Sequence, residues 1–172
     1  MANPNRSEST VTSSTHSSAF VLPPKLAALL ADYSAHHKTF GNKVTHYIGI
    51  PMIMMTLLGM LGQLVIGDGF TGSEVVRADG GMVLWGLAMA WYLSLDWRLA
   101  VPFGFVALGF YFAGRHLSLE VQVGGFILGW ILQFIGHGVY EKQRPAFLDN
   151  VRHLLIGPMW IFARLVGVLK KN

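Results

Sequence analysis

Cysteine is absent from this 172-residue sequence, and charged residues are scarce. The absence of thiols excludes a disulfide scaffold, a cysteine-ligated zinc or iron–sulfur site, and a cysteine nucleophile. Charged residues make up 13% of the chain, whereas soluble domains usually carry about 25%. Because a water-facing surface needs charged side chains, this shortage and a mean hydropathy of +0.46 argue against an ordinary soluble enzyme.

Several common functional motifs are also missing. The sequence contains no P-loop, no GxGxxG turn and no GxSxG nucleophile elbow. Its seven histidines are scattered, so they do not form the clustered boxes of a membrane di-iron desaturase. The net charge of +4 does not indicate nucleic acid, because Lys and Arg lie beside apolar runs instead of forming a patch interleaved with aromatics. A membrane is therefore the expected partner.

The chain divides into a polar tail and one apolar domain. Residues 1–19 are rich in Ser, Thr and Asn and are expected to form a disordered tail, which lacks the apolar core of a signal peptide. Residues 20–172 are expected to form a single membrane-embedded domain. This domain is predicted to begin with an amphipathic helix at the membrane surface, because apolar residues recur at helical spacing between residues 24 and 34.

Four long stretches without Asp, Glu, Lys or Arg are predicted to be transmembrane helices. They cover residues 48–66, 80–95, 99–114 and 121–140. Each is apolar on all faces and too long for a typical strand, which predicts an all-α, multi-pass helical bundle. Only three residues join the second and third stretches, so these are expected to form a tight antiparallel hairpin. The last apolar segment, residues 153–169, is interrupted by Gly157, Pro158 and Arg164 and is expected to lie in the interface or re-enter the membrane.

Positive charges indicate the orientation of this bundle. Four spans place residues 1–47, 96–98 and 141–172 on one side and residues 67–79 and 115–120 on the other. The first side carries eleven Lys and Arg residues, and the second carries only Arg77 and Arg115. By the positive-inside rule, both termini are predicted to be cytoplasmic. The membrane would be the bacterial inner membrane or the endoplasmic reticulum, depending on the source.

Two histidine-bearing segments are predicted to meet at the cytoplasmic boundary, because an even number of spans returns the chain to its starting side. His37 and His46 precede the first span, whereas His137 and Glu141 close the fourth. His116 is expected on the opposite side. Imidazoles and a carboxylate, with no thiolate available, suit iron(II), zinc or manganese, or an axial position on haem.

The spacing of the first two histidines requires a break between them. Nine residues separate His37 from His46, which places them half a turn out of phase on an unbroken helix. Both can face one site only if the helix is interrupted, and Gly41 is the expected position of the interruption. Asn42 could hydrogen-bond the backbone there or orient a ligating histidine.

The second segment offers a carboxylate beside its histidine. His137 and Glu141 are four residues apart, so they are expected to share a helix face. Glu141 could complete a metal site, support His137 or pair with Arg144. Gly125 and Gly129 form a GxxxG pattern suited to close helix contact. The other histidines on the cytoplasmic side are interpreted as amphipathic interfacial residues; they are His16, His36 and His153.

Motifs at both ends of the membrane domain resemble a known family. They are Tyr33 with HHKTFGNKVTHYIGIP, then WILQFIGHGVYEKQRPAFLDN, and then LLIGP at residues 154–158. Over residues 30–160 the chain resembles the yeast 2-hydroxy fatty acid dioxygenases and their bacterial relatives. The resemblance implies a small multi-pass membrane protein, in yeast of the endoplasmic reticulum. It further implies that iron(II) and molecular oxygen are used to shorten 2-hydroxy fatty acids by one carbon, a step in phytosphingosine breakdown to odd-chain acids.

The resemblance also assigns roles to individual residues. It implies that His37, His46 and His137 bind iron and, together with Glu141, form the catalytic site. Asn42 matches the family pattern as well. Histidine ligation that leaves open positions on iron(II) would let a 2-hydroxy acid chelate through its carboxylate and hydroxyl groups.

The substrate is expected to be a 2-hydroxy fatty acid whose acyl chain lies among the spans. Lys43, Lys142 or Arg144 could neutralise its carboxylate, and no spacing selects one of them. Arg164 departs from the resemblance, because related sequences tend to carry an acidic residue there.

Two other functions are compatible with the same residues. Two of the histidines could hold a haem between spans in an electron-transfer protein. Alternatively, the chain could be a lipid-binding membrane protein whose histidines hold no metal. The sequence does not determine an oligomeric state.

Overall fold

The computed structural model of the chain describes residues 20–67 and 78–169, and over these residues it is almost entirely helical. The six α-helices are α1 (Pro24–Ala35), α2 (Phe40–Leu61), α3 (Gly80–Leu95), α4 (Trp97–Arg115), α5 (Leu119–Ile135) and α6 (Arg152–Leu165). A π-helical turn, η1 (Gly136–Glu141), extends α5, and a 3₁₀ turn, η2 (Ala146–Leu148), precedes α6. Two short antiparallel strands, β1 (Val65–Gly67) and β2 (Ala78–Asp79), lie between α2 and α3. The expected tail, residues 1–19, lies outside the described residues.

Three helices are long and apolar enough to cross a membrane. They are α2 with 22 residues, α4 with 19 and the continuous helix formed by α5 and η1 with 23. The remaining expected span, α3, has 16 residues, which gives about 24 Å of helix against a hydrocarbon core of roughly 30 Å. The structure confirms an all-α membrane bundle, with three full-length candidate spans and one shorter apolar helix.

The expected hairpin between the second and third spans is tighter than the sequence indicated. Asp96 alone ends α3 and begins α4. Its side chain accepts a hydrogen bond from the backbone N–H of Arg98 at 3.0 Å, so it caps the first turn of α4. This cap starts α4 at Trp97, two residues before the expected start.

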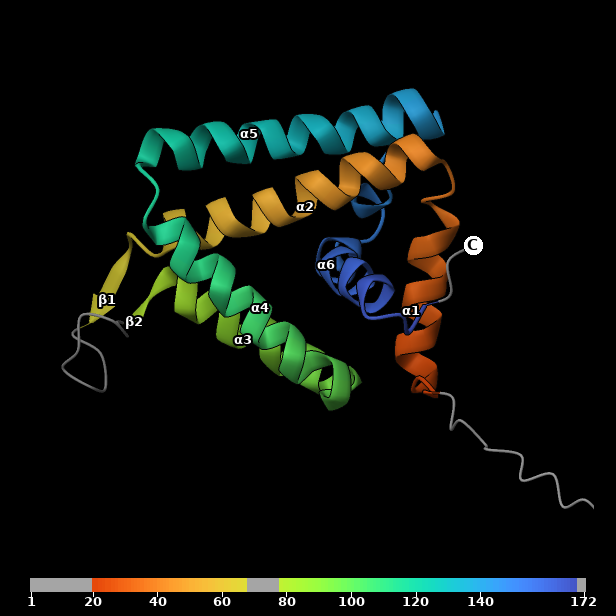
Figure 1. Cartoon of the computed structure of the whole chain (residues 1–172), viewed down its shortest axis with the longest axis horizontal. Helices are drawn as coiled ribbons and strands as arrows, with labels where there is room; N and C mark the ends of the chain where they lie inside the picture. The colour runs from red at the N-terminus through yellow and green to blue at the C-terminus, as the bar shows by residue number, and fades with distance from the viewer. Residues whose placement is uncertain (1–19, 68–77, 170–172) are drawn as a thin grey trace, which may run out of the picture.

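The helices form two arms that diverge from one end of the molecule (Figure 1). α2 and α5 lie side by side in one arm, and α3 and α4 form the other. The arms meet at Gly59 of α2 and Gly114 of α4. A Cβ atom on either glycine would collide with backbone atoms of the opposite helix. α1 and α6 occupy the region where the arms are farthest apart.

Small residues set the close contact between α2 and α5. A Cβ atom on Gly129 would collide with Ile53, and one on Gly125 would press against Thr56. The GxxxG pattern therefore faces α2, and it lets the two backbones approach closely. This contact places the start of α2 beside the end of α5.

The last apolar segment, expected in the interface or re-entering the membrane, forms a helix that packs in the bundle. α6 runs from Arg152 to Leu165 without interruption. Near the turn where Pro158 lacks a donor, the Tyr92 hydroxyl donates a hydrogen bond to the carbonyl of Leu155 at 2.5 Å. α6 is a core helix of the bundle, since its Met159 and Trp160 are at most 1% exposed.

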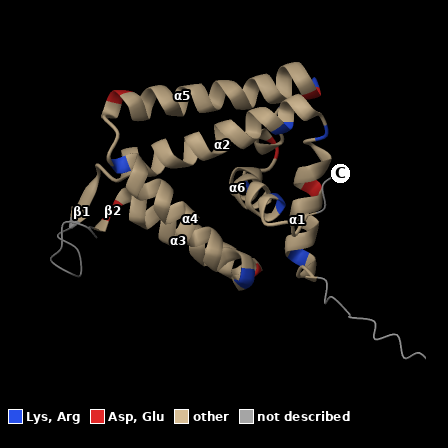
Figure 2. Ribbon diagram, in the orientation of Figure 1, with Lys and Arg blue, Asp and Glu red and all other residues tan. Residues whose placement is uncertain are grey.

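Basic residues gather at the end of the molecule where α1 and α6 lie (Figure 2). Arg115 is the basic residue at the opposite end of α2 within the described part of the chain. Arg98, in the hairpin of α3 and α4, donates to the carbonyl of Val21 at 2.7 Å and stacks over the Phe20 ring. The hairpin turn therefore lies beside the segment that leads into α1.

Candidate metal centre

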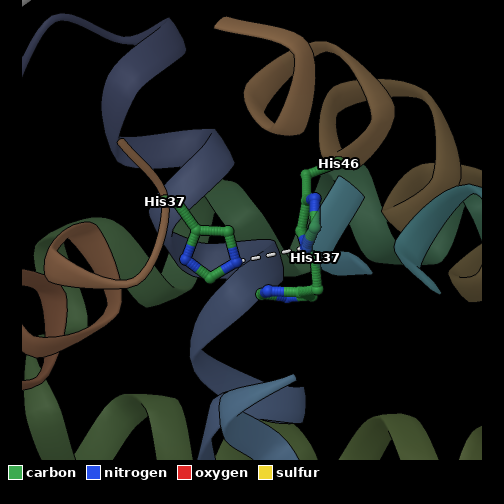
Figure 3. A group of neighbouring side chains, drawn as sticks. All are labelled: His37, His46 and His137. Atoms are coloured by element: carbon green, nitrogen blue, oxygen red, sulfur yellow. Dashed lines mark hydrogen bonds between the residues drawn. The ribbon is translucent and has the colours of Figure 1, made fainter. Parts of the chain in front are cut away.

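Three histidines from distant parts of the chain converge at the open end of the arms (Figure 3). His37 lies in the turn between α1 and α2, His46 in the second turn of α2, and His137 in η1. All three are at most 3% exposed, and one ligand nitrogen from each lies within 4.8 Å of the others. The ring centroids are 4.5 to 4.9 Å apart. The structure thus brings together the three histidines that the sequence singled out; they are called the histidine triad below.

The helix break that turns His37 toward His46 lies earlier in the chain than expected. α1 ends at Ala35, and Thr39 caps the start of α2 by accepting a hydrogen bond from the Asn42 N–H. Gly41 lies inside α2, where the ring of Tyr140 packs so closely that a Cβ atom would collide with it. The expectation of a break at Gly41 is therefore wrong, because a threonine N-cap, rather than a glycine, starts the second helix.

Backbone hydrogen bonds fix the orientation of two of the imidazole rings. Nδ1 of His37 lies 2.6 Å from the carbonyl of Tyr33, and Nδ1 of His46 lies 2.9 Å from the carbonyl of Asn42. A carbonyl can only accept, so in each ring Nδ1 carries the proton and Nε2 presents a lone pair. Asn42 thus orients His46 as the sequence suggested, through its backbone carbonyl.

The unprotonated Nε2 atoms of these two rings face each other. Nε2 of His37 and Nε2 of His46 are 3.1 Å apart, with no proton available between them in these tautomers. Two nitrogens bound to one ion at about 2.1 Å and near a right angle lie about 3 Å apart. A cation would turn this repulsion into coordination, so the triad fits a metal ion with three nitrogen ligands and open positions.

The same geometry does not fit a haem. Two axial ligands of a haem lie on opposite faces of the macrocycle. The three rings here meet edge to face with centroids within 4.9 Å, which leaves no space for a porphyrin between any two of them. The arrangement therefore favours a single ion over the haem alternative.

Burial keeps His37 in its neutral form. Burial, with a smaller contribution from neighbouring His46, lowers the pKa of His37 to about 2. The ring of Tyr33 stacks on His37 with centroids 3.9 Å apart and removes it from solvent. Neutral imidazole is the form that binds metal, so the environment of His37 favours ligation.

A glycine permits the close approach of His137 to His46. A Cβ atom on Gly136 would collide with the side chains of Asn42 and Thr45, and would also touch the ring of His46. Gly136 begins the π-helical turn that carries His137. Single π-helical turns inside α-helices occur frequently at functional sites.

Glu141 does not lie in the triad. Its Oε1 accepts hydrogen bonds from the backbone N–H groups of Lys38 and Thr39 at 2.6 and 2.7 Å, and from the side chain of Asn42 at 3.1 Å. The carboxylate therefore ties the end of η1 to the turn that carries His37. Arg144, its other expected partner, is paired with Asp149 at 2.8 Å.

A cavity of about 430 Å³ begins at the triad and runs between the two arms. Along α2 it extends from His46 to Leu58, about 18 Å at 1.5 Å per residue. Its wall is almost wholly apolar and includes Trp85, Met89 and Phe126. Its volume and lining are typical of sites for small apolar ligands.

The cavity opens at the start of α6. Of its lining residues, Val151, Arg152 and Leu154 are exposed, whereas the others are buried or half-buried. Two residues that line it, Gln133 and His153, each carry a buried polar atom, Nε2 and Nδ1, with no hydrogen-bond partner in the described part of the chain. The polar end of the cavity therefore lies near the triad and the mouth.

The basic residues proposed from the sequence lie outside this cavity. Lys43, Lys142 and Arg144 do not line it, whereas Arg152 does. Sequence reasoning missed Arg152 because one positive charge among many on the same side carries no spacing signal. Its position just before the last apolar segment was the available clue.

His153 is buried, although the sequence was interpreted as placing it among the interfacial histidines. It is 7% exposed, lines the cavity and lies 2.9 Å from a carboxylate oxygen of Asp32. His36 fits the interfacial interpretation, with 39% of its side chain exposed. His16 lies outside the described residues.

The remaining two positions lie away from the triad. His116 is exposed at the end of α4, at the opposite end of the arms, as the sequence predicted. Arg164 stacks over Trp160 at 5.0 Å, and the Trp160 ring lies 5.8 Å from the ring of His37. Arg164, the residue that departs from the family pattern, is therefore separated from the triad by the side chain of Trp160.

The chain is similar to known proteins over most of its length. Residues 24–169 match the family described as 2-hydroxy-palmitic acid dioxygenase Mpo1-like. The chain is 30% identical over 138 residues to 2-hydroxy-palmitic acid dioxygenase MPO1 of Saccharomyces cerevisiae, covering 79% of this chain and 76% of the relative. No solved structure matches the chain significantly. The resemblance seen in the histidine motifs is confirmed over nearly the whole membrane domain, and the chain belongs to the Mpo1-like family of 2-hydroxy-palmitic acid dioxygenases.

Proposed function

We propose that the protein is an iron(II)-dependent dioxygenase that converts 2-hydroxy fatty acids into fatty acids one carbon shorter. The observation that carries this proposal is the buried histidine triad at the polar end of an apolar cavity, in a chain of this family. The atoms balance if one O₂ oxidises C2 to the new carboxyl carbon, and the old carboxyl carbon leaves as carbon dioxide with one water. The reaction is an α-oxidation of the acyl chain.

His37, His46 and His137 would hold the iron. Three nitrogen ligands on one face leave positions open for other groups, as in non-haem iron oxygenases. When bound, iron(II) would supply open coordination positions and a redox centre through which electrons pass from the substrate to molecular oxygen. The backbone carbonyls behind His37 and His46 hold both rings in the ligating tautomer.

Glu141 would act as a positioning residue rather than as a ligand. Its carboxylate binds the backbone of Lys38 and Thr39, directly after His37. It also binds the side chain of Asn42, whose carbonyl orients His46. One carboxylate therefore restrains the segments that carry all three ligands.

The acyl chain of the substrate would occupy the apolar cavity. The cavity follows α2 away from the triad, so a fatty acid with its head group at the polar end of the cavity would extend toward Leu58. The yeast relative is named for 2-hydroxy-palmitic acid. Arg152 supports binding of the substrate carboxylate, because it is the Lys or Arg residue that lines the cavity and it lies at the mouth.

The triad and both termini would face the cytoplasm of a bacterium, or the cytosol if the membrane is the endoplasmic reticulum. The concentration of basic residues at the triad end supports this orientation through the positive-inside rule. The contact of Arg98 with Val21 supports a common side for the hairpin turn and the N-terminal segment. Residues 20–172 would form one membrane-embedded domain, with residues 1–19 as a tail outside it.

Product analysis tests this function directly. The full chain, purified in detergent without a histidine tag and loaded with iron(II) under anaerobic conditions, is mixed with 2-hydroxypalmitate and oxygen. Mass spectrometry should detect pentadecanoate. Absence of this product from protein with bound iron would contradict the proposal, and a Soret band in the purified protein would favour the haem alternative.

A further inference from the structure

A second buried histidine site lies beside the mouth of the cavity, outside the triad. His153, in the first turn of α6, is 7% exposed. Its Nε2 lies 2.9 Å from Oδ2 of Asp32 on α1. The ring also lies 5.7 Å from the ring of Tyr33, which stacks on His37. His153 is thus one aromatic ring away from the triad but is not a member of it.

The opposite nitrogen of His153 has no partner. Asp32 is an acceptor, so Nε2 of His153 donates to it; in the tautomer that carries its proton on Nε2, Nδ1 is then an acceptor. Nδ1 is buried without a hydrogen bond to any described residue, and His153 lines the cavity. An unpaired buried acceptor is costly. An occupant of the cavity that carries a hydrogen-bond donor would remove this cost.

The neighbouring residue has the complementary chemistry. Arg152 also lines the cavity, and its guanidinium group can only donate hydrogen bonds. The two residues therefore offer a cationic donor and an acceptor at one end of the cavity. A 2-hydroxy acid presents the matching pair, a carboxylate that accepts and, on the adjacent carbon, a hydroxyl that donates.

We propose that Arg152 and His153 form the head-group site of the substrate. In this site Arg152 binds the carboxylate, and His153, oriented by Asp32, accepts a hydrogen bond from the 2-hydroxyl group. A site built to pair with a hydroxyl group rejects analogues that lack it, because its own polar atom is then left unpaired. His153 thereby selects 2-hydroxy fatty acids over ordinary fatty acids. This inference rests on the proposed function for its substrate class.

Equilibrium binding to the metal-free protein tests the selection without catalysis. The affinities of 2-hydroxypalmitate and palmitate are measured with the full chain in detergent micelles. The unaltered protein should prefer 2-hydroxypalmitate. His153→Leu should reduce this preference about tenfold, the effect of one lost hydrogen bond, mainly by weakening 2-hydroxypalmitate. Arg152→Ala should weaken both ligands by a similar factor, because both carry the carboxylate.

Two further variants separate recognition from packing. His153→Asn keeps an acceptor near the position of Nδ1 and should restore part of the preference. His36→Leu removes the other histidine that contacts Asp32 but does not line the cavity, so it should leave the preference unchanged. Equal weakening of both ligands by His153→Leu, or a preference unchanged in that variant, would overturn the proposal.

Measuring bound iron distinguishes failure of the head-group proposal from failure of the proposed dioxygenase function. The triad is intact in the His153 variants, so they should bind iron as the unaltered protein does. If the unaltered protein binds no iron but still selects 2-hydroxypalmitate, the dioxygenase assignment fails and the head-group site stands. If it binds iron and forms product without such a preference, the head-group site fails and the assignment stands.

Discussion

A buried polar cluster lies near each end of α2, and the two clusters differ in whether their hydrogen bonds are satisfied within the chain. At the end where the arms meet, Oδ2 of Asp79 accepts from the Tyr111 hydroxyl at 2.5 Å, and Oδ1 accepts from the Met82 N–H at 2.9 Å. Arg115 donates to the oxygen of Tyr111 at 3.0 Å. Donors and acceptors alternate through this cluster, so its hydrogen bonds are satisfied within the chain.

At the other end, the triad brings acceptors against one another. The backbone hydrogen bonds of His37 and His46 leave both Nε2 lone pairs directed at the same point. Burial excludes the water that would otherwise pair with them. The comparison distinguishes a structural cluster from a candidate binding site: the Asp79 cluster is complete by itself, whereas the triad leaves lone pairs that a cation could bind.

The largest difference between the two ends should appear when a ligand is removed. Replacing His37, His46 or His137 with Ala leaves two nitrogens for the ion, so bound iron measured by elemental analysis should fall at least tenfold. His116→Ala, at the opposite end, should leave the iron content unchanged. Equal loss of iron in all four variants would contradict the assignment of the site to the triad end.

The next largest effect should come from filling the space between the ligands. Gly136→Ala places a Cβ atom against Asn42 and Thr45, which must separate His46 from His137. Overpacking of this kind typically costs about 1 to 3 kcal/mol of stability, and iron affinity from competition with a chelator should fall about tenfold or more.

Gly138→Ala is the matched control, because a Cβ atom there meets nothing within 4 Å in the same π-helical turn. Its iron affinity should equal that of the unaltered protein. A loss of affinity in Gly138→Ala as large as that in Gly136→Ala would attribute the effect to the turn rather than to the contact.

Breaking the self-satisfied cluster should affect stability alone. Tyr111→Phe removes the hydroxyl donor of the fully buried Asp79, at a cost of about 1 to 3 kcal/mol for a buried group left unpaired. Thermal unfolding in detergent should show the loss, while iron content stays constant. Tyr140→Phe, at an exposed tyrosine, should change neither quantity. Loss of iron in Tyr111→Phe would mean that the two ends are coupled.

The smallest effect is expected at Asp96, in the hairpin near the N-terminal segment. Hydrogen bonds from Arg98 lower the pKa of Asp96 below its ordinary value of 3.8. Its charge therefore stabilises the fold fully above that value, and the contribution disappears as the pH falls through the lowered pKa. Asp96→Ala should cost about 1 kcal/mol at neutral pH through loss of the cap.

Unfolding measured across acidic pH checks this sign. The difference between Asp96→Ala and the unaltered protein should shrink as the medium is acidified. Asp96→Asn keeps a capping oxygen and should lose less at neutral pH. A difference that grows with acidification would show that the charge of Asp96 does not stabilise the hairpin.

The helical bundle and the triad could be predicted because they depend on patterns along the chain. Long uncharged runs identify apolar helices, and the expectation of an even number of spans placed residues 37, 46 and 137 on one side. The break between His37 and His46 was placed wrongly at Gly41, because capping by Thr39 depends on local backbone geometry that a permissive glycine does not reveal. The burial of α6 in the bundle could not be read from its interrupted apolar run, because it depends on packing against other helices, including the hydrogen bond from Tyr92 of α3 to the carbonyl of Leu155.

The roles of the polar side chains could not be predicted in the same way. Glu141 was one helical turn from His137 in the sequence, but the π-helical turn and the adjacent loop direct it toward Lys38 and Thr39. Arg152 and His153 gave no periodic or spacing signal. Their position at the cavity mouth depends on how α6 docks between the arms.

The sequence by itself determined the membrane class, the apolar helices and which histidines share a side, because hydropathy and span number act through local composition and chain connectivity. Only the tertiary structure decided which atoms face one another. Close glycine contacts bring α2 against α5, backbone carbonyls set the tautomers of His37 and His46, and the docking of α6 encloses the cavity. These depend on distances between segments far apart in the chain, which hydrophobic periodicity does not encode.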